Sequence, residues 1–178
     1  LSDTLLTVEK NVLITGGAGF IGSHLAADLL DAGGWRVTIV DDLNDFYPLE
    51  VKRANLREIA EHGEMDFVEA DIRNAEGLAS VFERTSFDCI VHLAARAGVR
   101  PSLSEPKLYS DTNINGTLNL LELARDHKVP QFVFGSSSSV YGINSKVPFA
   151  EDDPIFRPIS PYAATKAAGE LLCHTYSH

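Results

Sequence analysis

Residues 14–25 read ITGGAGFIGSHL, and this stretch decides the fold. It grows out of the apolar, β-rich run NVLIT at residues 11–15. Gly16, Gly19 and Gly22 fit G-x-x-G-x-x-G, and Gly17 with the last two fits G-x-G-x-x-G. Such glycines make a tight turn, let the backbone approach a pyrophosphate and let the next helix pack closely. The helix start offers N–H groups and a positive dipole end to phosphate. A glycine pattern alone is weak evidence, but between a strand and a helix it predicts a dinucleotide-binding loop.

Apolar, β-rich runs recur along the chain, and each is followed by a helical pattern. The five runs lie at residues 11–15, 35–40, 65–70, 88–94 and 131–135. Near-continuous hydrophobicity favours strands that are buried on both faces of a parallel sheet. Strand-helix alternation therefore predicts an α/β fold with a doubly wound, Rossmann-type parallel sheet. Residues 136–161 are rich in Ser, Pro and Asp and are interpreted as a long functional loop.

Composition excludes several functional classes. With 178 residues, 44% apolar and 22% charged, the chain is typical of one globular domain or at most two small ones. A net charge of −10 argues against a nucleic-acid or anionic-membrane surface. Cys89 and Cys173 do not form a disulfide framework, and with no visible signal or membrane segment we expect a cytoplasmic protein with Cys89 buried. His174 and His178 are four apart but lack a third ligand, so no metal site is predicted.

Acidic residues follow two of the predicted strands. The second strand ends in Asp41 and Asp42, and Asp41 lies 25 residues after Gly16, near the spacing of about 20 that places a carboxylate on the adenosine ribose. A carboxylate accepts from a ribose 2′-OH and repels a 2′-phosphate, which favours NAD over NADP. The alternative is an ordinary polar strand end. Asp71 and Ile72 follow the third strand, where the pair flanks adenine or caps the next helix, and the two roles are compatible.

A tyrosine and a lysine stand four residues apart in SPYAATK, residues 160–166. On a helix Tyr162 and Lys166 share one face, and Pro161 suits the first turn. A nearby ammonium favours the phenolate form of a tyrosine, which can act as a base. Upstream, residues 135–142 read GSSSSVYG, just past the fifth strand, where α/β sheets bind ligands. Either motif alone is weak evidence, and the serine run alone is a polar turn. Together they predict a base with a hydroxyl beside it.

Seven motifs together resemble the extended short-chain dehydrogenase/reductase family, the sugar-nucleotide epimerases and dehydratases. They are TGGAGFIGSHL, DDLND, ADIRN, HLAARAGVRPS, NINGTLNLLE, SSSSVYG and SPYAATK, and they cover nearly the whole chain. The resemblance implies that NAD is the cofactor and that Ser137, Tyr162 and Lys166 form the catalytic triad. The cofactor contacts that it implies are Gly16, Gly19, Phe20, Ile21, Asp41, Asp42, Asp71, Ile72, Leu93, Ala94, Ala95, Asn113 near the nicotinamide end, Tyr162 and Lys166.

Within this family the resemblance favours a 4-epimerase. Dehydratases carry Asp and Glu directly after the catalytic Ser or Thr, whereas this chain has Ser138 and Ser139. The stretches AARAGVRPS, DDLNDFYPLEVKRANL and SSSSVYGINSKVPF are most similar to UDP-glucuronate 4-epimerases. UDP-glucose and UDP-N-acetylglucosamine 4-epimerases are the close alternative. The resemblance implies that Ser138 and Ser139 lie near the sugar carboxylate. Arg100 either adds positive charge there or anchors a loop.

The resemblance also implies a UDP-sugar substrate and a homodimer built partly from a helix at residues 108–127 and the tyrosine helix. Two other classes stay open: a net oxidoreductase acting on 4-keto sugars, and a nucleotide-binding module without catalysis. Family members continue after the tyrosine helix with more strands and a smaller nucleotide-sugar-binding lobe, which residues 1–178 do not contain. We therefore expect residues 1–178 to be the NAD-binding domain, able to bind NAD but not to epimerise by itself.

Overall fold

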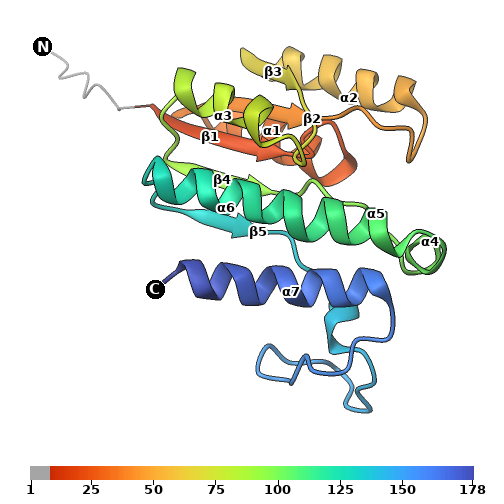
Figure 1. Ribbon diagram of the computed structural model, residues 1–178. Coiled ribbons are helices and arrows are strands. Elements are labelled where there is room, and N and C mark those ends of the chain that lie inside the picture. The colour runs from red at the N-terminus through yellow and green to blue at the C-terminus, as the bar shows by residue number, and fades with distance from the viewer. Residues whose placement is uncertain (1–8) are drawn as a thin grey trace, which may run out of the picture.

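A five-stranded parallel sheet organises the computed structural model, which describes residues 9–178 (Figure 1). The strands are β1 (Lys10–Thr15), β2 (Trp35–Asp41), β3 (Met65–Glu69), β4 (Cys89–His92) and β5 (Phe132–Phe134). Their order is β3-β2-β1-β4-β5, and every adjacent pair is parallel. The order reverses between β1 and β4, which is where doubly wound sheets bind ligands. The predicted Rossmann-type fold is confirmed, and each predicted strand is present.

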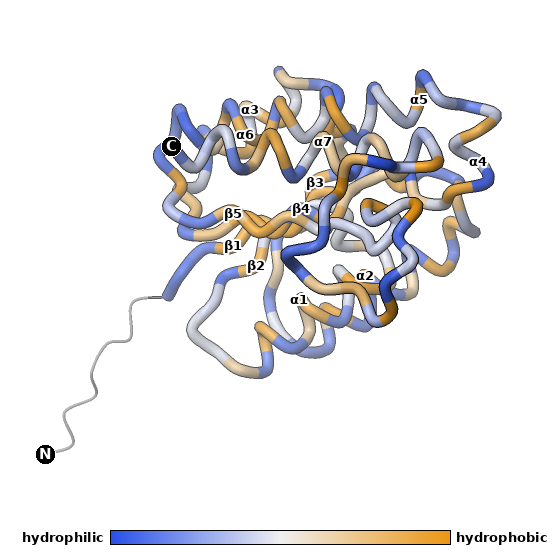
Figure 2. Tube along the Cα trace, turned by 90° about the horizontal axis from the view of Figure 1, so that it is seen from below, coloured by the Kyte–Doolittle hydropathy of each residue, from blue (hydrophilic) through white to orange (hydrophobic). Residues whose placement is uncertain are grey.

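Helices cover both faces of the sheet (Figure 2). Helices α1 (Phe20–Ala32) and α2 (Leu49–His62) lie on one face. Helices α3 (Ala75–Arg84), α6 (Gly116–Asp126) and α7 (Pro161–Tyr176) lie on the other. Successive strand residues point to opposite faces. Val12 and Ile14 therefore pack in the core under α1 and α2, whereas Leu13 packs in the core under α3 and α6. Cys89 is buried, as predicted.

The chain segment between β4 and β5 contains a local irregularity. Helices α4 (Val99–Ser104) and α5 (Pro106–Ser110) lead into a π-helical turn, η1 (Asp111–Asn115), which continues as α6. Asn113 and Thr112 lie within this turn and are buried. Single π turns inside helices often occur at functional sites, because they redirect the side chains around them. Here the turn replaces the uninterrupted helix that the sequence predicts over residues 108–127.

Residues 135–160 connect β5 to α7 mostly without regular structure. A short 3-10 helix, η2 (Ser138–Tyr141), interrupts this segment, and α7 starts at Pro161. The Ser160 side chain caps α7 by accepting a hydrogen bond of 3.1 Å from the Ala163 N–H. Proline in the first helical turn agrees with the sequence prediction, and the serine N-cap is a further feature of this start. Among residues 9–178 no helix is both long and apolar enough to cross a membrane.

Candidate active site

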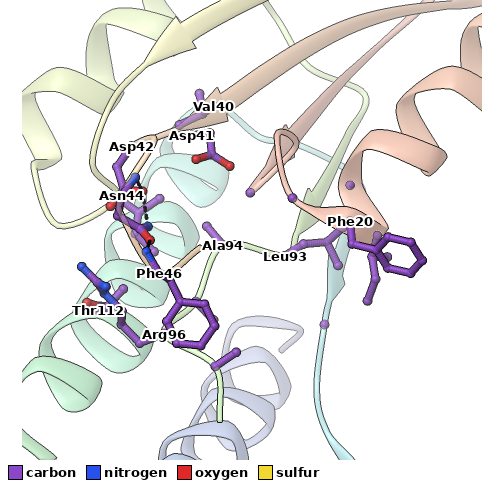
Figure 3. Close-up of a pocket in the computed structure, with 18 of the residues that line it drawn as sticks. Phe20, Val40, Asp41, Asp42, Asn44, Phe46, Leu93, Ala94, Arg96 and Thr112 are labelled. Atoms are coloured by element: carbon purple, nitrogen blue, oxygen red, sulfur yellow. Dashed lines mark hydrogen bonds between the residues drawn. The ribbon is translucent and has the colours of Figure 1, made fainter. Parts of the chain in front are cut away.

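A cavity of about 360 Å³ lies at the carboxyl ends of the strands (Figure 3). Its walls come from the glycine loop after β1, the segment after β2, the segments after β3 and β4, the π turn and the start of α7. Cavities of this size are typical of small-molecule sites. Phe20 lies across the cavity from Asp42 and Asn44.

Glycines let the loop after β1 pack closely against the end of β4 and the start of α1. Gly16 has φ +72°, and a Cβ added there would lie 2.6 Å from the Ala94 nitrogen. A Cβ added at Gly22 would lie 2.5 Å from the Gly16 carbonyl oxygen, so only glycine lets α1 start against the loop. No side chain caps α1 at Gly19, so its first N–H groups face the cavity uncapped by protein side chains. This loop fits a pyrophosphate.

Asp41 is held rigidly at the end of β2. Its Oδ2 accepts a hydrogen bond of 3.2 Å from the Ala18 N–H, and its Oδ1 accepts one of 2.9 Å from the Leu43 N–H. Oδ1 also accepts one of 3.0 Å from Lys52 Nζ. An ionised carboxylate has about four acceptor positions, so one remains for a ligand hydroxyl. Asp41 and Asp42 both line the cavity, where the sequence places them.

Lys52 is a functional candidate that the sequence did not reveal. It belongs to α2, lines the cavity and is only 4% exposed. Its ammonium lies 3.0 Å from Asp41 and 3.9 Å from Asp42, and 5.4 Å from the centroid of the Tyr47 ring. A buried ammonium is tolerated because these carboxylates compensate its charge. No spacing along the chain signals this pairing, since it depends on how α2 packs.

Asp71 and Ile72 line the cavity beyond β3, as predicted. The Asp71 carboxylate pairs with the Arg73 guanidinium at 2.5 Å, and this hydrogen-bonded cation is the main reason that the pKa of Asp71 is lowered. The alternative prediction that Asp71 caps the next helix is wrong. Asn74 caps α3, because its Oδ1 accepts a hydrogen bond of 3.1 Å from the Gly77 N–H.

The segment after β4 forms the cavity floor. Leu93, Ala94 and Ala95 line the cavity, as predicted. Asn113 does not line it, because its side chain is fully engaged by protein groups behind the wall. Its Oδ1 accepts a hydrogen bond of 2.8 Å from the Arg96 N–H. Its Nδ2 donates to the Arg96 carbonyl oxygen and to Thr165 Oγ1, both at 3.0 Å. The neighbouring Thr112 lines the cavity instead.

Tyr162 and Lys166 line the same cavity from the first turns of α7. Lys166 is 4% exposed, and its Nζ donates a hydrogen bond of 2.7 Å to the Gly135 carbonyl oxygen at the end of β5. Burial lowers the pKa of Lys166 to about 8. The Tyr162 ring meets the ring of Tyr109 edge to face, with centroids 6.3 Å apart. The pair that the sequence predicts is therefore assembled at the cavity wall.

The predicted hydroxyl and substrate residues lie beyond the lining of this cavity. Ser137 is the N-cap of η2, and its Oγ accepts a hydrogen bond of 3.2 Å from the Ser139 N–H. Ser138 and Arg100 are exposed and, like Ser139, do not line the cavity. Ser136 lines it and donates a hydrogen bond to Glu170. Among the four serines, Ser136 therefore lines the cavity, and the catalytic role expected for Ser137 stays a prediction.

A family model provides independent evidence. The model described as GDP-mannose 4,6 dehydratase matches residues 13–178. The chain belongs to the GDP-mannose 4,6 dehydratase family. This membership agrees with the resemblance to sugar-nucleotide epimerases and dehydratases that the motifs indicate. Among residues 9–178 no group of three His, Cys, Asp or Glu side chains is arranged to hold a metal ion.

Individual relatives show which enzymes this chain is similar to. The chain is 48% identical over 166 residues to UDP-glucuronate 4-epimerase of Thermodesulfobacterium geofontis, covering 93% of this chain and 51% of that protein. It is 46% identical to UDP-glucuronate 4-epimerase 4 of Arabidopsis thaliana, covering 94% of this chain and 38% of that protein. The chain thus spans about half, or less, of the length of these relatives.

Solved structures of UDP-sugar 4-epimerases also match this chain. The UDP-Glc/GlcNAc 4-epimerase of Campylobacter jejuni matches with a TM-score of 0.86 at 30% identity, over 94% of this chain and 49% of that one. The UDP-glucuronic acid 4-epimerase of Bacillus cereus, in complex with UDP-glucuronic acid and NAD, matches with a TM-score of 0.84 at 37% identity. That match covers 93% of this chain and 52% of the other.

Proposed function

We propose that the protein catalyses NAD-dependent C4 epimerisation of a UDP-sugar, with UDP-glucuronate as the first candidate substrate. One observation carries the proposal: Tyr162 and Lys166 line the same cavity as the glycine loop and Asp41. A base, a buried cation and a dinucleotide cradle therefore meet in one site. The curated relatives are about twice as long as this chain, so the activity is proposed for the complete protein, with residues 1–178 as its NAD-binding domain.

NAD is the cofactor that these residues fit. The glycine loop and the start of α1 would hold the pyrophosphate, Asp41 would accept from the adenosine ribose, and Asp71 with Ile72 would flank the adenine. Two carboxylates, Asp41 and Asp42, face the ribose end of the cavity and disfavour a 2′-phosphate. In support, the UDP-glucuronic acid 4-epimerase of Bacillus cereus and the UDP-glucose 4-epimerase of Thermus thermophilus have been solved in complex with NAD.

The chemistry assigned to this chain is proton transfer at the sugar 4-OH. Bound NAD supplies a reversible hydride acceptor. The Tyr162 phenolate oxygen takes the proton from the 4-OH and later returns it, and the Lys166 ammonium stabilises the phenolate. A serine hydroxyl after β5 donates to the same sugar oxygen. Ser137 is the candidate from the family motif, whereas Ser136 lines the cavity but donates its one hydroxyl proton to Glu170.

UDP-glucuronate is preferred as substrate for two reasons. Relatives named as UDP-glucuronate 4-epimerases are 44–48% identical to this chain. Ser138 and Ser139 carry no carboxylate, so they would not repel a uronate, and the acid pair of a dehydratase is missing. The serines and Arg100 are therefore proposed to contact the sugar in the complete protein. A UDP-glucose or UDP-N-acetylglucosamine substrate is the second candidate, since the Campylobacter jejuni epimerase shares the fold with a TM-score of 0.86.

We also propose that the complete protein is a homodimer and is located in the cytoplasm. A homodimer through α5, α6 and α7 follows the family resemblance, and light scattering on the complete protein would measure its mass. Cys89 and Cys173 are free thiols, which suits the cytoplasm proposed from the sequence.

The decisive experiment incubates the complete protein and NAD with UDP-glucuronate, UDP-glucose and UDP-N-acetylglucosamine, and identifies C4 epimers by NMR. The expected product is UDP-galacturonate without net formation of NADH. Stoichiometric release of NADH would instead indicate a net oxidoreductase. Equal or faster conversion of UDP-glucose would overturn the uronate assignment.

A further inference from the structure

A buried chain of hydrogen bonds leads from the cavity floor to the π turn. It starts at the Ala94 N–H, which donates to Thr15 Oγ1 at 3.3 Å. Thr15 Oγ1 lies 2.7 Å from His92 Nδ1, and His92 Nε2 lies 2.9 Å from Thr117 Oγ1. Thr117 in turn donates to the Asn113 carbonyl oxygen at 2.7 Å. Thr15, His92 and Thr117 are each at most 1% exposed, so water does not share these bonds.

The contacts fix the direction of every bond in this relay of Thr15, His92 and Thr117. A threonine hydroxyl has one proton to donate. Thr117 gives its proton to the Asn113 carbonyl, so it can only accept from His92, and Nε2 must carry the ring proton. Nδ1 is then an acceptor and receives the proton of Thr15. The Thr15 oxygen remains free to accept from Ala94. The imidazole is therefore neutral and in its Nε2–H form.

The charge state of the ring agrees with this geometry. Burial, with a smaller contribution from the nearby Lys166 charge, lowers the pKa of His92 to about 3. A protonated ring would need an acceptor at both nitrogens, and Thr15 would then have no acceptor for its own proton. The lowered pKa and the hydrogen bonds to both ring nitrogens therefore both favour the neutral ring at neutral pH.

The relay ends at Asn113 in the π turn, and this residue also contacts two other segments that line the site. Asn113 binds both backbone groups of Arg96, and it binds Thr165, the neighbour of Lys166. Ala94, held through the relay, is the residue against which Gly16 of the glycine loop packs. One buried turn therefore sets the spacing between the cavity floor, the glycine loop and α7.

We propose that His92 is a positioning residue of the cofactor site, which acts through Thr15 and Thr117 to hold Ala94 in register with Asn113 and α7. The inference rests on the proposed NAD-dependent function. The alternative is that His92 only fills the core, since its ring also lies 6.0 Å from that of Phe132 and 5.8 Å from that of Phe134, between centroids. If His92 only fills the core, phenylalanine should replace it without loss of function. If His92 acts through its hydrogen bonds, phenylalanine should not replace it.

The test compares Thr117→Val, which removes the acceptor for His92, with Thr117→Ser, which keeps it. Thr38→Val, a buried strand position outside the relay, is the matched control. His92→Phe keeps the ring volume and removes both ring hydrogen bonds. For each folded variant, calorimetry measures the Kd for NAD, and NMR measures amide hydrogen exchange at Ala94 and Arg96. In the wild-type protein, nitrogen NMR reads the His92 tautomer.

The expected result is an Nε2–H tautomer in the wild-type protein. Thr117→Val and His92→Phe should weaken NAD binding by at least about tenfold and accelerate exchange at Ala94 by at least about tenfold. In Thr117→Ser and Thr38→Val, the Kd for NAD and the exchange rate at Ala94 should both stay within about threefold of the wild-type values. An Nδ1–H tautomer, or unchanged exchange and affinity in Thr117→Val and His92→Phe, would overturn the proposal. If the wild-type protein bound no NAD, the proposed function would fail, while tautomer and exchange would still decide whether the relay positions Ala94.

Discussion

Lys166 Nζ donates a hydrogen bond of 2.7 Å to the carbonyl oxygen of Gly135, so the lysine of α7 is tied to the end of β5. The same ammonium lies 4.9 Å from the centroid of the Phe134 ring. No carboxylate contributes to the shift of its pKa, which burial alone lowers to about 8. The Lys166 ammonium is thus buried and contacts one carbonyl oxygen and one aromatic ring. This environment suits a cation that is proposed to stabilise a phenolate.

The free energy of unfolding should rise between about pH 8 and pH 10.5 because of Lys166. The pKa is about 8 in the folded protein and 10.5 is its ordinary value. In this window the unfolded chain binds the proton more strongly, so raising the pH favours the folded state. The full difference corresponds to about 3 kcal/mol. Urea unfolding of wild type and Lys166→Met across this window measures it.

The comparison needs an exposed lysine as its control. Lys107→Met removes a lysine from the exposed surface of α5 and should keep the wild-type pH dependence. Lys166→Met should lose the rise, because methionine has no proton to exchange. If the free energy of unfolding changed with pH in the same way in wild type and in Lys166→Met, the pKa of Lys166 would not be lowered in the folded protein.

Tyr162→Phe should abolish turnover while leaving NAD bound. The phenolic oxygen is the proposed proton acceptor, and loss of a positioned acid–base group costs at least about 10²-fold in rate. The ring remains to pack edge to face against Tyr109. The Kd for NAD should stay within about threefold, as measured by calorimetry. Tyr176→Phe is the control, since Tyr176 lies at the far end of α7 and bonds Glu122. Near-normal turnover in Tyr162→Phe would assign the base elsewhere.

Much of this architecture was predictable because its causes are local. Apolar runs define strands, and Gly22 is required by backbone contacts with Gly16 and Gly17 in its own loop. Tyr162 and Lys166 lie on one helix face, and Pro161 marks the first turn of that helix. Each of these features follows from residues a few positions apart.

The missed features depend on contacts between distant segments. Thr15 and His92 are 77 residues apart, and their pairing depends on the register of β1 against β4. Lys52 becomes a cavity residue only because α2 packs beside β2. Asn113 lies in the π turn, and its amide bonds Arg96 and Thr165 in place of a ligand, which no spacing in the sequence predicts. Sequence periodicity gives the elements, whereas packing decides which polar side chains face the ligand.

Gly22→Ala should weaken NAD binding by at least about tenfold and destabilise the fold by about 1–3 kcal/mol, the usual cost of overpacking. The added Cβ would lie 2.5 Å from the Gly16 oxygen and 2.7 Å from Gly17 Cα, both backbone atoms. α1 would have to move away from the loop. Gly77→Ala in α3 is the control, since its Cβ would meet only the Asn74 side chain. Calorimetry and urea unfolding measure both effects. Unchanged affinity in Gly22→Ala would mean that the glycine loop does not bind the pyrophosphate.

Asp41 and Lys52 should decide the choice between NAD and NADP. In the wild-type protein the two carboxylates of Asp41 and Asp42 outweigh the single ammonium of Lys52, so the Kd for NAD should be at least about tenfold lower than that for NADP. Asp41→Asn leaves one carboxylate opposite Lys52, whose charge then favours a 2′-phosphate. The ratio of the two Kd values should shift toward NADP by at least about tenfold, or about 1.4 kcal/mol. Asp45→Asn, an exposed carboxylate of the same segment, should leave the ratio unchanged. Because Asp41 and Lys52 are buried, the shift should depend only weakly on salt concentration. Wild-type protein that binds NADP as tightly as NAD would contradict the assignment of Asp41 to the adenosine ribose.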